Sequence, residues 1–428
     1  MKKILVYCLP FFFLQFSFAQ NHDSHFIHDL LLVNQDSLGK KIIENPEKYR
    51  LQIIYTRIDR DKDNHPSFQT YHYRTELDEY FYPASTVKLF TSALALEKIN
   101  QLKIKELDKF DIMLTDSVYI GQTSVKVDTT SENGLPSIAH YIKKILVTSD
   151  NDAFNRLYEF IGQEPLNEKL KAKGFDDLRL THRLSISLPQ DENKHTNQIR
   201  LLDSHSGKLL FTQEGQFSTK DYTNQSDLFL GKAYVKGDQL IESPMNFKDK
   251  NAVSLANLHQ LLLRLIFPDK FSASDQFDLS ETDYQFLYQY MSQLPRETVY
   301  PDYSELPDNF CKFFMFGDKN GIRIPDHLRI FNKIGDAYGF SVDNAYIVDF
   351  KNNIATAEGI MDSVGNEQQK PSFKDGDNEF NYKKLRYNFK TAKEFVYTTY
   401  TQEGDLFVQG VETKFISKES DSTLLYDQ

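Results

Sequence analysis

The order of strand-like and helix-like segments limits the possible folds of this chain more than any other feature. Residues 51–56 and 68–73 are rich in β-branched and aromatic side chains and flank a turn-like segment at 59–66, which predicts two paired strands. Strand-like segments return only late in the chain, at 329–333, 338–350 and 354–361. This order predicts an α/β (α+β) fold, in which both ends of the chain build one antiparallel sheet flanked by helices, with a helical lobe inserted between its halves.

Helical patches separated by polar loops fill much of the remaining chain. Helices are predicted at 28–44, 85–99, 141–162, 251–267, 282–294 and 387–400. A long polar stretch at 185–250 is predicted to hold short strands around 209–211 and 232–235.

The expected domains follow from this order. Residues 20–84 and 320–402 are expected to form the α/β lobe, and residues 85–319 the helical lobe, with a polar insertion at about 204–250. Residues 403–428 form a polar C-terminal tail. A cleft between the two lobes is the natural place for a site.

The first 19 residues have the layout of a cleaved secretory signal peptide. Lys2 and Lys3 are basic, residues 4–16 are almost wholly apolar, and Ser17-Phe18-Ala19 supplies small residues where a signal peptidase cuts. The alternative is an N-terminal membrane anchor, but the apolar run is shorter than the about 20 residues that a spanning helix needs. We therefore expect a periplasmic or secreted protein without a stable membrane anchor.

Charge and cysteine content exclude several classes of partner and site. The formal net charge is −11 at pH 7, and removal of Lys2 and Lys3 with the signal makes it −13 (−11 − 2). Such an acidic chain argues against nucleic acid and anionic membranes as partners. Of the two cysteines, Cys8 lies in the signal, which leaves Cys311 unable to form an internal disulfide. Its phenylalanine neighbours indicate that Cys311 is a core residue.

Ser85-Thr86-Val87-Lys88 is an S-x-x-K motif at the start of a helix. Residues three apart share a helix face, so Lys88 can reach the Ser85 hydroxyl and take its proton if burial or a nearby cation lowers the lysine pKa. The motif alone is weak evidence, because Ser37-Leu38-Gly39-Lys40 has the same spacing and no other sign of a site. The helix after Ser85 is almost wholly apolar, which a solvent-exposed serine cap would not require. We therefore interpret Ser85 as a nucleophile.

Ser149-Asp150-Asn151 is a second candidate, between an apolar stretch at 145–147 and a helical run at 153–161. A hydroxyl and a carboxamide two residues apart on a turn can point into one cleft, with Asp150 turned back to brace the loop. The alternative is an ordinary helix N-cap, for which these residue types are also typical.

Lys333-Ile334-Gly335, followed by Asp336, is a third candidate. A lysine at a strand edge offers a cation, and a glycine lets a substrate approach the backbone closely. A competing K-x-G at 319–321 lies in a turn-like segment without a strand around it.

These three motifs, in this order, resemble the S-x-x-K, S-D-N and K-T-G motifs of the penicillin-recognising serine enzymes. The resemblance is closest to class A β-lactamases and the β-lactamase/transpeptidase-like family around them, and it covers most of residues 45–400. It implies that Ser85 is acylated, that Lys88 is the base for acylation or holds the proton network, and that Ser149 passes a proton to the leaving group.

The resemblance also implies binding roles. Asn151 would bond the substrate amide, and Lys333 would supply positive potential that keeps the lysine base deprotonated and attracts a carboxylate. The backbone N–H groups of Ser85 and Asp336, beside Gly335, would form the oxyanion hole. The resemblance implies no metal or cofactor, and its substrates are small molecules or peptides, β-lactams among them.

The sequence departs from the family pattern at two positions. Ile334 replaces the threonine of K-T-G, so a hydroxyl that helps to hold a substrate carboxylate is missing. Ser185 stands where class A β-lactamases place a glutamate, two residues after an arginine, here Arg183, to activate the water that clears the acyl-enzyme. Asp191 and Glu192 are nearby acids, but the loop would have to be rebuilt to use them.

The sequence thus predicts an exported serine hydrolase that acts by acyl transfer on an amide or ester and releases β-lactams slowly. The alternatives are a peptidoglycan D,D-peptidase or another penicillin-binding relative, and a non-catalytic binding module with the same fold. Asp59, Asp61 and Asp63 are interpreted as part of a hairpin turn, because the series lacks the glycine and the glutamate of a calcium loop.

Overall fold

The computed structural model describes most of the chain between residues 25 and 407. The described residues are 25–32, 37–63, 65–75, 79–224, 226–236, 239–317, 321–349, 394–402 and 406–407. The predicted signal peptide at 1–19, the predicted strand at 354–361 and nearly all of the predicted tail at 403–428 lie outside these residues. The limits expected for the two lobes stay predictions.

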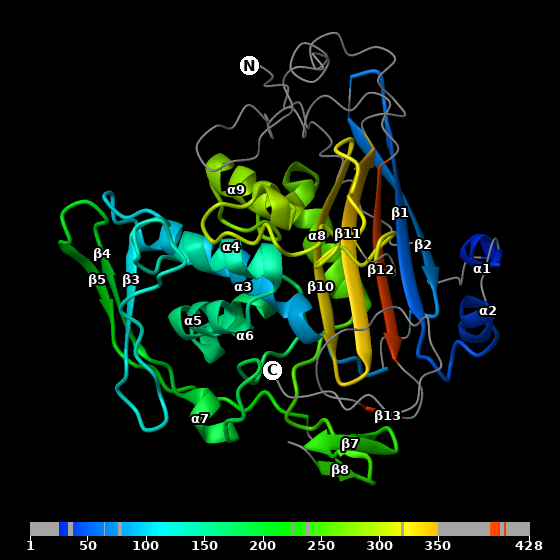
Figure 1. Cartoon of the computed structure of the whole chain (residues 1–428), viewed down its shortest axis with the longest axis horizontal. Coiled ribbons are helices and arrows are strands. Elements are labelled where there is room, and N and C mark those ends of the chain that lie inside the picture. The colour runs from blue at the N-terminus through cyan, green and yellow to red at the C-terminus, as the bar shows by residue number, and fades with distance from the viewer. Residues whose placement is uncertain are drawn as a thin grey trace, which may run out of the picture.

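The main sheet is built from both ends of the chain, as the order of segments predicts (Figure 1). Its strands are β1 (Gln52–Arg60), β2 (Pro66–Tyr73), β10 (Leu328–Ala337), β11 (Phe340–Asp349) and β12 (Glu394–Gln402), in the order β10-β11-β12-β1-β2. All neighbours are antiparallel, and Tyr55 lies opposite Tyr397 where the two halves meet. The predicted α/β fold with an antiparallel sheet is confirmed.

The predicted helix at 387–400 is wrong, because residues 394–402 form strand β12 in the middle of the sheet. Seven of its nine residues are Phe, Val, Tyr or Thr, which lose side-chain freedom in a helix and pack well on a pleated surface. The strand pairs with β1 on one side and β11 on the other. Residue preference and tertiary pairing therefore agree on a strand.

Two predicted helices are each divided in the structure. The stretch at 28–44 overlaps α1 (His25–Leu31) and α2 (Ser37–Glu44), and the stretch at 141–162 overlaps α4 (Ile138–Thr148) and α5 (Asn151–Ile161), with α1 and α4 each beginning three residues earlier than predicted. The second division occurs at Ser149, whose φ of 61° is left-handed and ends α4. Ser149 therefore lies in a tight turn between two helices.

Helix α3 (Val87–Leu102) occupies the centre of the helical region (Figure 1). Residues on all its sides are buried, which is typical of a helix enclosed by other elements. The other helices of this region are α6 (Gln163–Ala172), α7 (Gln190–Lys194), α8 (Leu255–Ile266) and α9 (Glu281–Ser292). Helix α3 contacts α4 and α5, whereas α8 and α9 pack on the sheet, so one hydrophobic core continues from the sheet into the helices.

Short strands form three small sheets away from the main one. They are β3 (Ile112–Asp116) with β4 (Gln198–Leu202) and β5 (Leu209–Gln213), β7 (Ala233–Lys236) with β8 (Gln239–Ile241) and β13 (Leu406–Phe407), and β6 (Phe229–Leu230) with β9 (Met245–Asn246). The short strands predicted around 209–211 and 232–235 are confirmed as β5 and β7.

The polar stretch that carries β4 to β9 is flanked by two segments that pair with each other. Arg179 and Ala252 exchange two backbone hydrogen bonds of 2.9 Å. The buried side chain of Asn251 accepts hydrogen bonds from the backbone N–H groups of Thr181 (2.8 Å) and His182 (3.2 Å). These contacts fix the start of the loop at 183–195, which contacts the candidate site.

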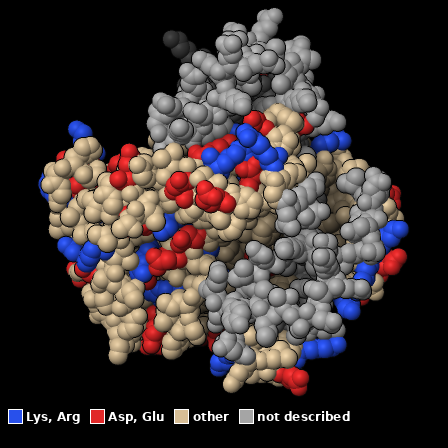
Figure 2. Space-filling model, in the orientation of Figure 1, with Lys and Arg blue, Asp and Glu red and all other residues tan. Residues whose placement is uncertain are grey.

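Three further features concern the surface of the molecule. Helix α1 packs against β2, where the rings of Phe26 and Tyr71 lie 4.7 Å apart. Among the described residues, no helix has both the length and the apolar character needed to cross a bilayer. On the face shown in Figure 2, acidic and basic side chains of the described residues are interspersed.

Candidate active site

Ser85 lies in a single 3₁₀ turn, η1 (Ala84–Thr86), that leads directly into α3. Ala84 adopts a left-handed φ of 45°, and the Thr86 hydroxyl donates to Pro83 O at 2.6 Å, which fixes the turn. The α-helix itself begins at Val87, two residues later than the sequence predicts. The half-buried Ser85 therefore precedes the helix N-terminus, where backbone N–H groups favour negative charge.

Lys88 lies one turn after Ser85 and is fully buried, with 0% of its surface exposed. Its Nζ donates to Asn151 Oδ1 (2.6 Å), to Ser149 Oγ (3.2 Å) and to Ser149 O. Burial and the nearby Lys333 hold the pKa of Lys88 well below its ordinary value, and Asp150 opposes this shift. Within the described residues, Ser85 Oγ has no hydrogen bond, so Lys88 is held by the Ser149 turn rather than by Ser85.

The turn at 149–151 combines both interpretations of its sequence. The Asp150 carboxylate accepts a hydrogen bond from Ala153 N at 2.7 Å and is the N-cap of α5, so it braces the turn as predicted. Because Asp150 takes the capping role, the side chains of Ser149 and Asn151 remain available for Lys88. Lys144 lies 3.7 Å from Asp150 and adds an ion pair.

Lys333 reaches the same turn from the edge of the sheet. Its Nζ donates to Ser149 Oγ at 2.7 Å and to Ile334 O at 2.8 Å. Burial lowers the pKa of Lys333 to about 8, while Cys311 and Asp343 oppose the shift. Two amines from distant parts of the chain, Lys88 and Lys333, thus meet at one hydroxyl. The structure thus brings together Lys88, Ser149 and Lys333, one residue from each of the three sequence motifs.

Gly335 lets strand β10 approach the Ser85 turn. A Cβ atom at this position would lie 2.6 Å from Pro83 O and 3.0 Å from Ser85 N, closer than side chains tolerate. The backbone of β10 therefore lies directly against the backbone of the turn. Asp336 is the next residue of β10 and is half-buried, opposite Ser341 of β11. The site thus has an alcohol, two amines and a strand edge in one place.

Comparison with models of protein families shows to which family the chain belongs. The model of a family described as the β-lactamase enzyme family matches residues 63–370. The chain belongs to this β-lactamase family. Its fold is accordingly the β-lactamase-like arrangement of an antiparallel sheet and helices. No curated protein sequence matches the chain.

Solved structures with a similar arrangement are distant in sequence. A β-lactamase from Desulfarculus baarsii is 14% identical with a TM-score of 0.42, covering 88% of this chain and 93% of that chain. A β-lactamase from Sphaerobacter thermophilus is 10% identical with a TM-score of 0.40, covering 85% and 86%. A β-lactamase from Streptomyces albus G is 14% identical with a TM-score of 0.40, covering 86% and 90%.

In this member of the β-lactamase family, Ser185 of the loop at 183–195 contacts the turn at 149–151. Asn151 Nδ2 donates to Ser185 Oγ at 2.7 Å. Asn155 holds the adjoining loop, because its side chain donates to Leu184 O (3.0 Å) and accepts from Leu184 N (2.9 Å). The sequence did not identify this role of Asn155, although its place one helical turn after Asn151 was a usable signal. A hydroxyl, not a carboxylate, therefore reaches the site from this loop.

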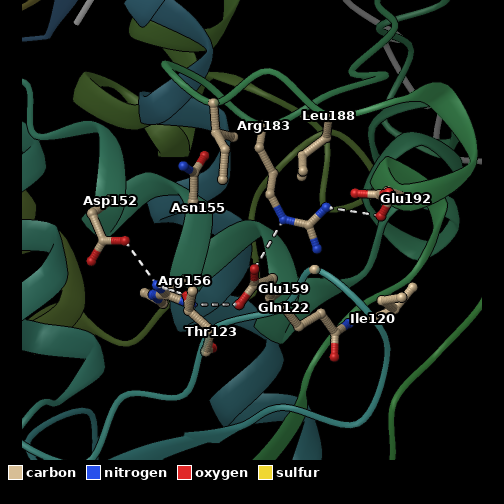
Figure 3. A pocket seen from close by; sticks show the side chains of 12 residues that line it. Ile120, Gln122, Thr123, Asp152, Asn155, Arg156, Glu159, Arg183, Leu188 and Glu192 are labelled. Atoms are coloured by element: carbon tan, nitrogen blue, oxygen red, sulfur yellow. Dashed lines mark hydrogen bonds and ion pairs between the residues drawn. The ribbon is translucent and has the colours of Figure 1, made fainter.

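The two acids noted further along this loop, Asp191 and Glu192, lie elsewhere. Figure 3 shows a hollow between α5, the loop at 183–195 and the segment at 120–123. Glu192 lines this hollow, where its carboxylate lies against Gly121. Asp191 is largely exposed, with His195 as a distant ion-pair partner at 3.9 Å. Neither acid has a hydrogen bond to the Ser149 turn among the described contacts.

Arg183 closes the loop around this hollow. Its Nε donates to Glu159 Oε1 at 2.9 Å, and a terminal nitrogen donates to the carbonyl group of Glu192 at 3.3 Å (Figure 3). The other terminal nitrogen donates to the carbonyl group of His195 at 2.7 Å. Glu159 also pairs with Arg156 at 3.3 Å. The charge of Glu159 is thus paired with Arg156 and Arg183 inside the fold, and the contacts of Arg183 hold the loop that carries Ser185.

Two further interpretations of the sequence are confirmed. Cys311 is buried, as expected of a core residue. Asp61 Oδ1 accepts hydrogen bonds from the N–H groups of Asp63 (2.9 Å) and His65 (2.8 Å), which is the hairpin turn between β1 and β2. Asp61, Asp63 and His65 are exposed.

Proposed function

We propose that the chain is an exported serine hydrolase that acts on an amide or ester through an acyl-enzyme at Ser85. The observation that carries this proposal is the convergence of Lys88 Nζ and Lys333 Nζ on Ser149 Oγ, at 3.2 and 2.7 Å, beside the turn that holds Ser85. Membership of the β-lactamase family supports the same reaction class. A buried site with perturbed lysines is typical of catalytic centres.

The proposed reaction begins with proton transfer from the Ser85 hydroxyl. Lys88 accepts the proton because burial and Lys333 disfavour its charged form. The Ser85 oxygen then bonds to the substrate carbonyl carbon, and the C–N or C–O bond of the leaving group breaks. The proton passes through Ser149 to the leaving group, while the N–H groups of Ser85 and Asp336 stabilise the oxyanion. Asn151 orients the substrate amide.

Deacylation is proposed to be slow. A general base contributes typically 10² to 10⁴-fold to a proton-transfer step, and the residue that reaches Asn151 from the loop is Ser185. Ile334, in place of the K-T-G threonine, also removes a hydroxyl for a substrate carboxylate. Both features favour a penicillin-binding or D,D-peptidase-like enzyme over an efficient β-lactamase. A non-catalytic binding module would not need this set of contacts between Lys88, Ser149 and Lys333.

Intact-protein mass spectrometry tests the proposal. The chain is incubated with a β-lactam and, separately, with an activated ester, and each adduct is followed in time. We expect an adduct that forms on the parent chain, is absent in Ser85→Ala and persists with the β-lactam. Ser37→Ala is the matched control, because Ser37 heads the second S-x-x-K sequence. The absence of any adduct with both probes would favour the binding module.

The natural substrate is tested by direct comparison. Nitrocefin, a p-nitrophenyl ester and a D-Ala-D-Ala peptide are offered to the same preparation, and turnover is measured for each. We expect little nitrocefin turnover. Fast nitrocefin turnover that is lost in Ser85→Ala would contradict slow deacylation and identify an efficient β-lactamase.

Export is a separate part of the proposal and has its own test. The layout of residues 1–19 supports cleavage after Ala19. N-terminal sequencing of the protein from fractionated cells is expected to begin at Gln20 in the periplasmic or secreted fraction. An intact N-terminus in the cytoplasmic fraction would contradict export.

A further inference from the structure

A buried lysine lies behind the strand that carries Lys333. Lys312 is 2% exposed, and its Nζ donates to Met291 O (2.6 Å), Ile330 O (2.9 Å) and Asn332 Oδ1 (2.7 Å). These bonds use all three N–H groups of an ammonium. Burial lowers the pKa of Lys312 to about 8, and an apolar side chain would avoid this desolvation. Since the proposed reaction does not use Lys312, its burial requires another explanation.

Lys312 is part of a connected set of hydrogen bonds, which we call the Lys312 network and define as Lys312, Asn332 and Asp343. Asn332 Nδ2 donates to Asp343 Oδ1 (3.0 Å) and to Cys311 O (2.9 Å). Asp343 Oδ2 accepts from Phe314 N at 2.8 Å. The network thus ties the end of α9, strands β10 and β11, and the segment at 311–314 together.

The network and the candidate site lie on opposite faces of β10. Asn332 directly precedes Lys333, and successive side chains of a strand point to opposite faces. Asn332 faces Lys312 and Asp343, whereas Lys333 reaches Ser149. In the described sheet β10 is an edge strand paired with β11 alone, so one side of its backbone lacks a neighbouring strand. Bonds from behind therefore fix the strand that sets the position of Lys333.

The charges around Lys333 come from three elements. Lys88 on α3 is a cation when protonated, Cys311 is a neutral thiol because burial raises its pKa, and Asp343 on β11 is the buried carboxyl group. Burial raises the pKa of Asp343 as well, but hydrogen bonds from Asn332 and from a backbone N–H oppose this, as do Lys312 and Lys333.

Lys312 has its own charged neighbours besides Asp343. Glu297 favours its charge and Arg329 opposes it, and these two side chains form an ion pair of 3.0 Å with each other. Asp343 is therefore the one carboxylate, among the described groups acting on these lysines, that stabilises both Lys312 and Lys333.

We propose that Lys312, Asn332 and Asp343 are positioning residues, which fix edge strand β10 and stabilise the positive charge of Lys333 where it bonds to the Ser149 hydroxyl. Their consequence for acylation rests on the proposed function, whereas their effect on the charge of Lys333 does not. Asp343 acts through Lys333 and is not expected to contact substrate.

Lysine NMR of the whole mature chain tests the charge without any need for activity. Lysine is labelled with ¹³C at Cε, and the Lys333 signal is assigned by its loss in Lys333→Met. We expect Asp343→Asn to lower the titration midpoint of Lys333 by about one pH unit, because a nearby opposite charge is removed. An unchanged midpoint would overturn the proposal. Should Asp343→Asn fail to fold, Asp343→Ser makes the same change of charge with a smaller side chain.

A matched control separates this effect from loss of any buried ion pair. Asp283 and Lys109 form such a pair at 3.0 Å, with both side chains nearly fully buried. Asp283→Asn is expected to reduce stability but to leave the Lys333 midpoint unchanged. An equal shift in Asp283→Asn would show a general loosening of the fold and overturn the specific role of Asp343.

The rate of Ser85 labelling by an activated ester tests the consequence for acylation. We divide the labelling rate of Asp343→Asn by that of the parent chain at each pH, and expect this ratio to be about five-fold or more lower at pH 8.5 than at pH 6.5. The reason is that a titration midpoint one unit lower removes the charge of Lys333 at a lower pH. A ratio that is constant with pH would contradict a role through Lys333. If the midpoint shifts but Ser85 of the parent chain takes no label from any probe, the proposed function fails while the Lys312 network stands.

Discussion

Ser149 receives hydrogen bonds from two lysines whose charges repel each other. Lys88 is the more strongly shifted amine, because burial and Lys333 both lower its pKa, whereas Lys333 retains a pKa of about 8. Burial and mutual repulsion therefore disfavour the state in which both amines are charged. In the proposed reaction, Lys88 would then be the base next to Ser85 and Lys333 the cation at the strand edge, from residues of the same type.

The pH dependence of acylation should follow Lys333. As pH rises through about 8, Lys333 loses its charge, and the labelling rate of Ser85 is expected to fall. In Lys333→Arg the cation persists to much higher pH, so the decline should move upward by more than one pH unit. Labelling rates between pH 6 and 10 provide the measurement. A decline that stays near pH 8 in Lys333→Arg would assign it to another group.

Ser185 should limit the release of the acyl group. Asn151 Nδ2 donates to its hydroxyl, so a carboxylate at this position would lie beside the site. Ser185→Glu is expected to shorten the lifetime of the β-lactam adduct by roughly ten-fold or more, as a general base for water. Mass spectrometry of the adduct over time gives the lifetime. Ser185→Gln has the same size without the base and should leave the lifetime within about two-fold; an equal effect of both variants would refute the argument.

At the scale of elements, the site depends on how closely β10 approaches the 3₁₀ turn η1. The approach is possible because position 335 has no Cβ, and β10 is held from behind by the Lys312 network. The alternation of side chains along β10 then sends Lys333 to Ser149. A small lateral shift of this strand would move the cation and the backbone N–H donor together.

Gly335→Ala should therefore impair both acylation and stability. The added Cβ would meet Pro83 O at 2.6 Å and Ser85 N at 3.0 Å, so β10 or the turn must move. We expect the labelling rate of Ser85 to fall by about ten-fold or more and the free energy of unfolding to fall by about 1–3 kcal/mol, the usual cost of overpacking. Gly134→Ala is the control, because its φ of 73° strains any side chain but its Cβ would meet no atom within 4 Å. A normal labelling rate in Gly335→Ala would contradict the close approach.

The sequence identified the elements of the site better than their connections. Ser85, Lys88 and Ser149 lie in local motifs whose spacing limits their geometry, so their convergence could be predicted. The strand character of residues 394–402 was missed although seven of these nine residues favour a strand, whereas the pairing with β1 and β11 joins distant segments and could not be read from the local sequence. The Lys312 network was missed because its bonds join residues that are up to 29 positions apart (343 − 314) and share no motif.

At the scale of the whole molecule, the two ends of the chain enclose the segment that carries most of the site. Strands β1 and β12 pair in the middle of the sheet, so the sheet can be completed only after the helical region between them has been synthesised. Helix α8 lies against this junction, with contacts to β1, β11 and β12. Interactions between α8 and the sheet therefore stabilise both halves of the fold at once.

One of these interactions should make the fold sensitive to acid. His259 of α8 is 2% exposed, its Nε2 bonds to Thr56 Oγ1 of β1 at 2.8 Å, and burial lowers its pKa to about 3. The unfolded chain takes up this proton near pH 6.5, so stability is full above that pH and decreases below it, by about 2–3 kcal/mol between pH 6.5 and 4.5. Urea unfolding at both pH values should show a smaller decrease in His259→Gln than in the parent chain. His65→Gln, which changes an exposed histidine, should keep the parent's decrease, and an equal decrease in His259→Gln would exclude His259 as its source.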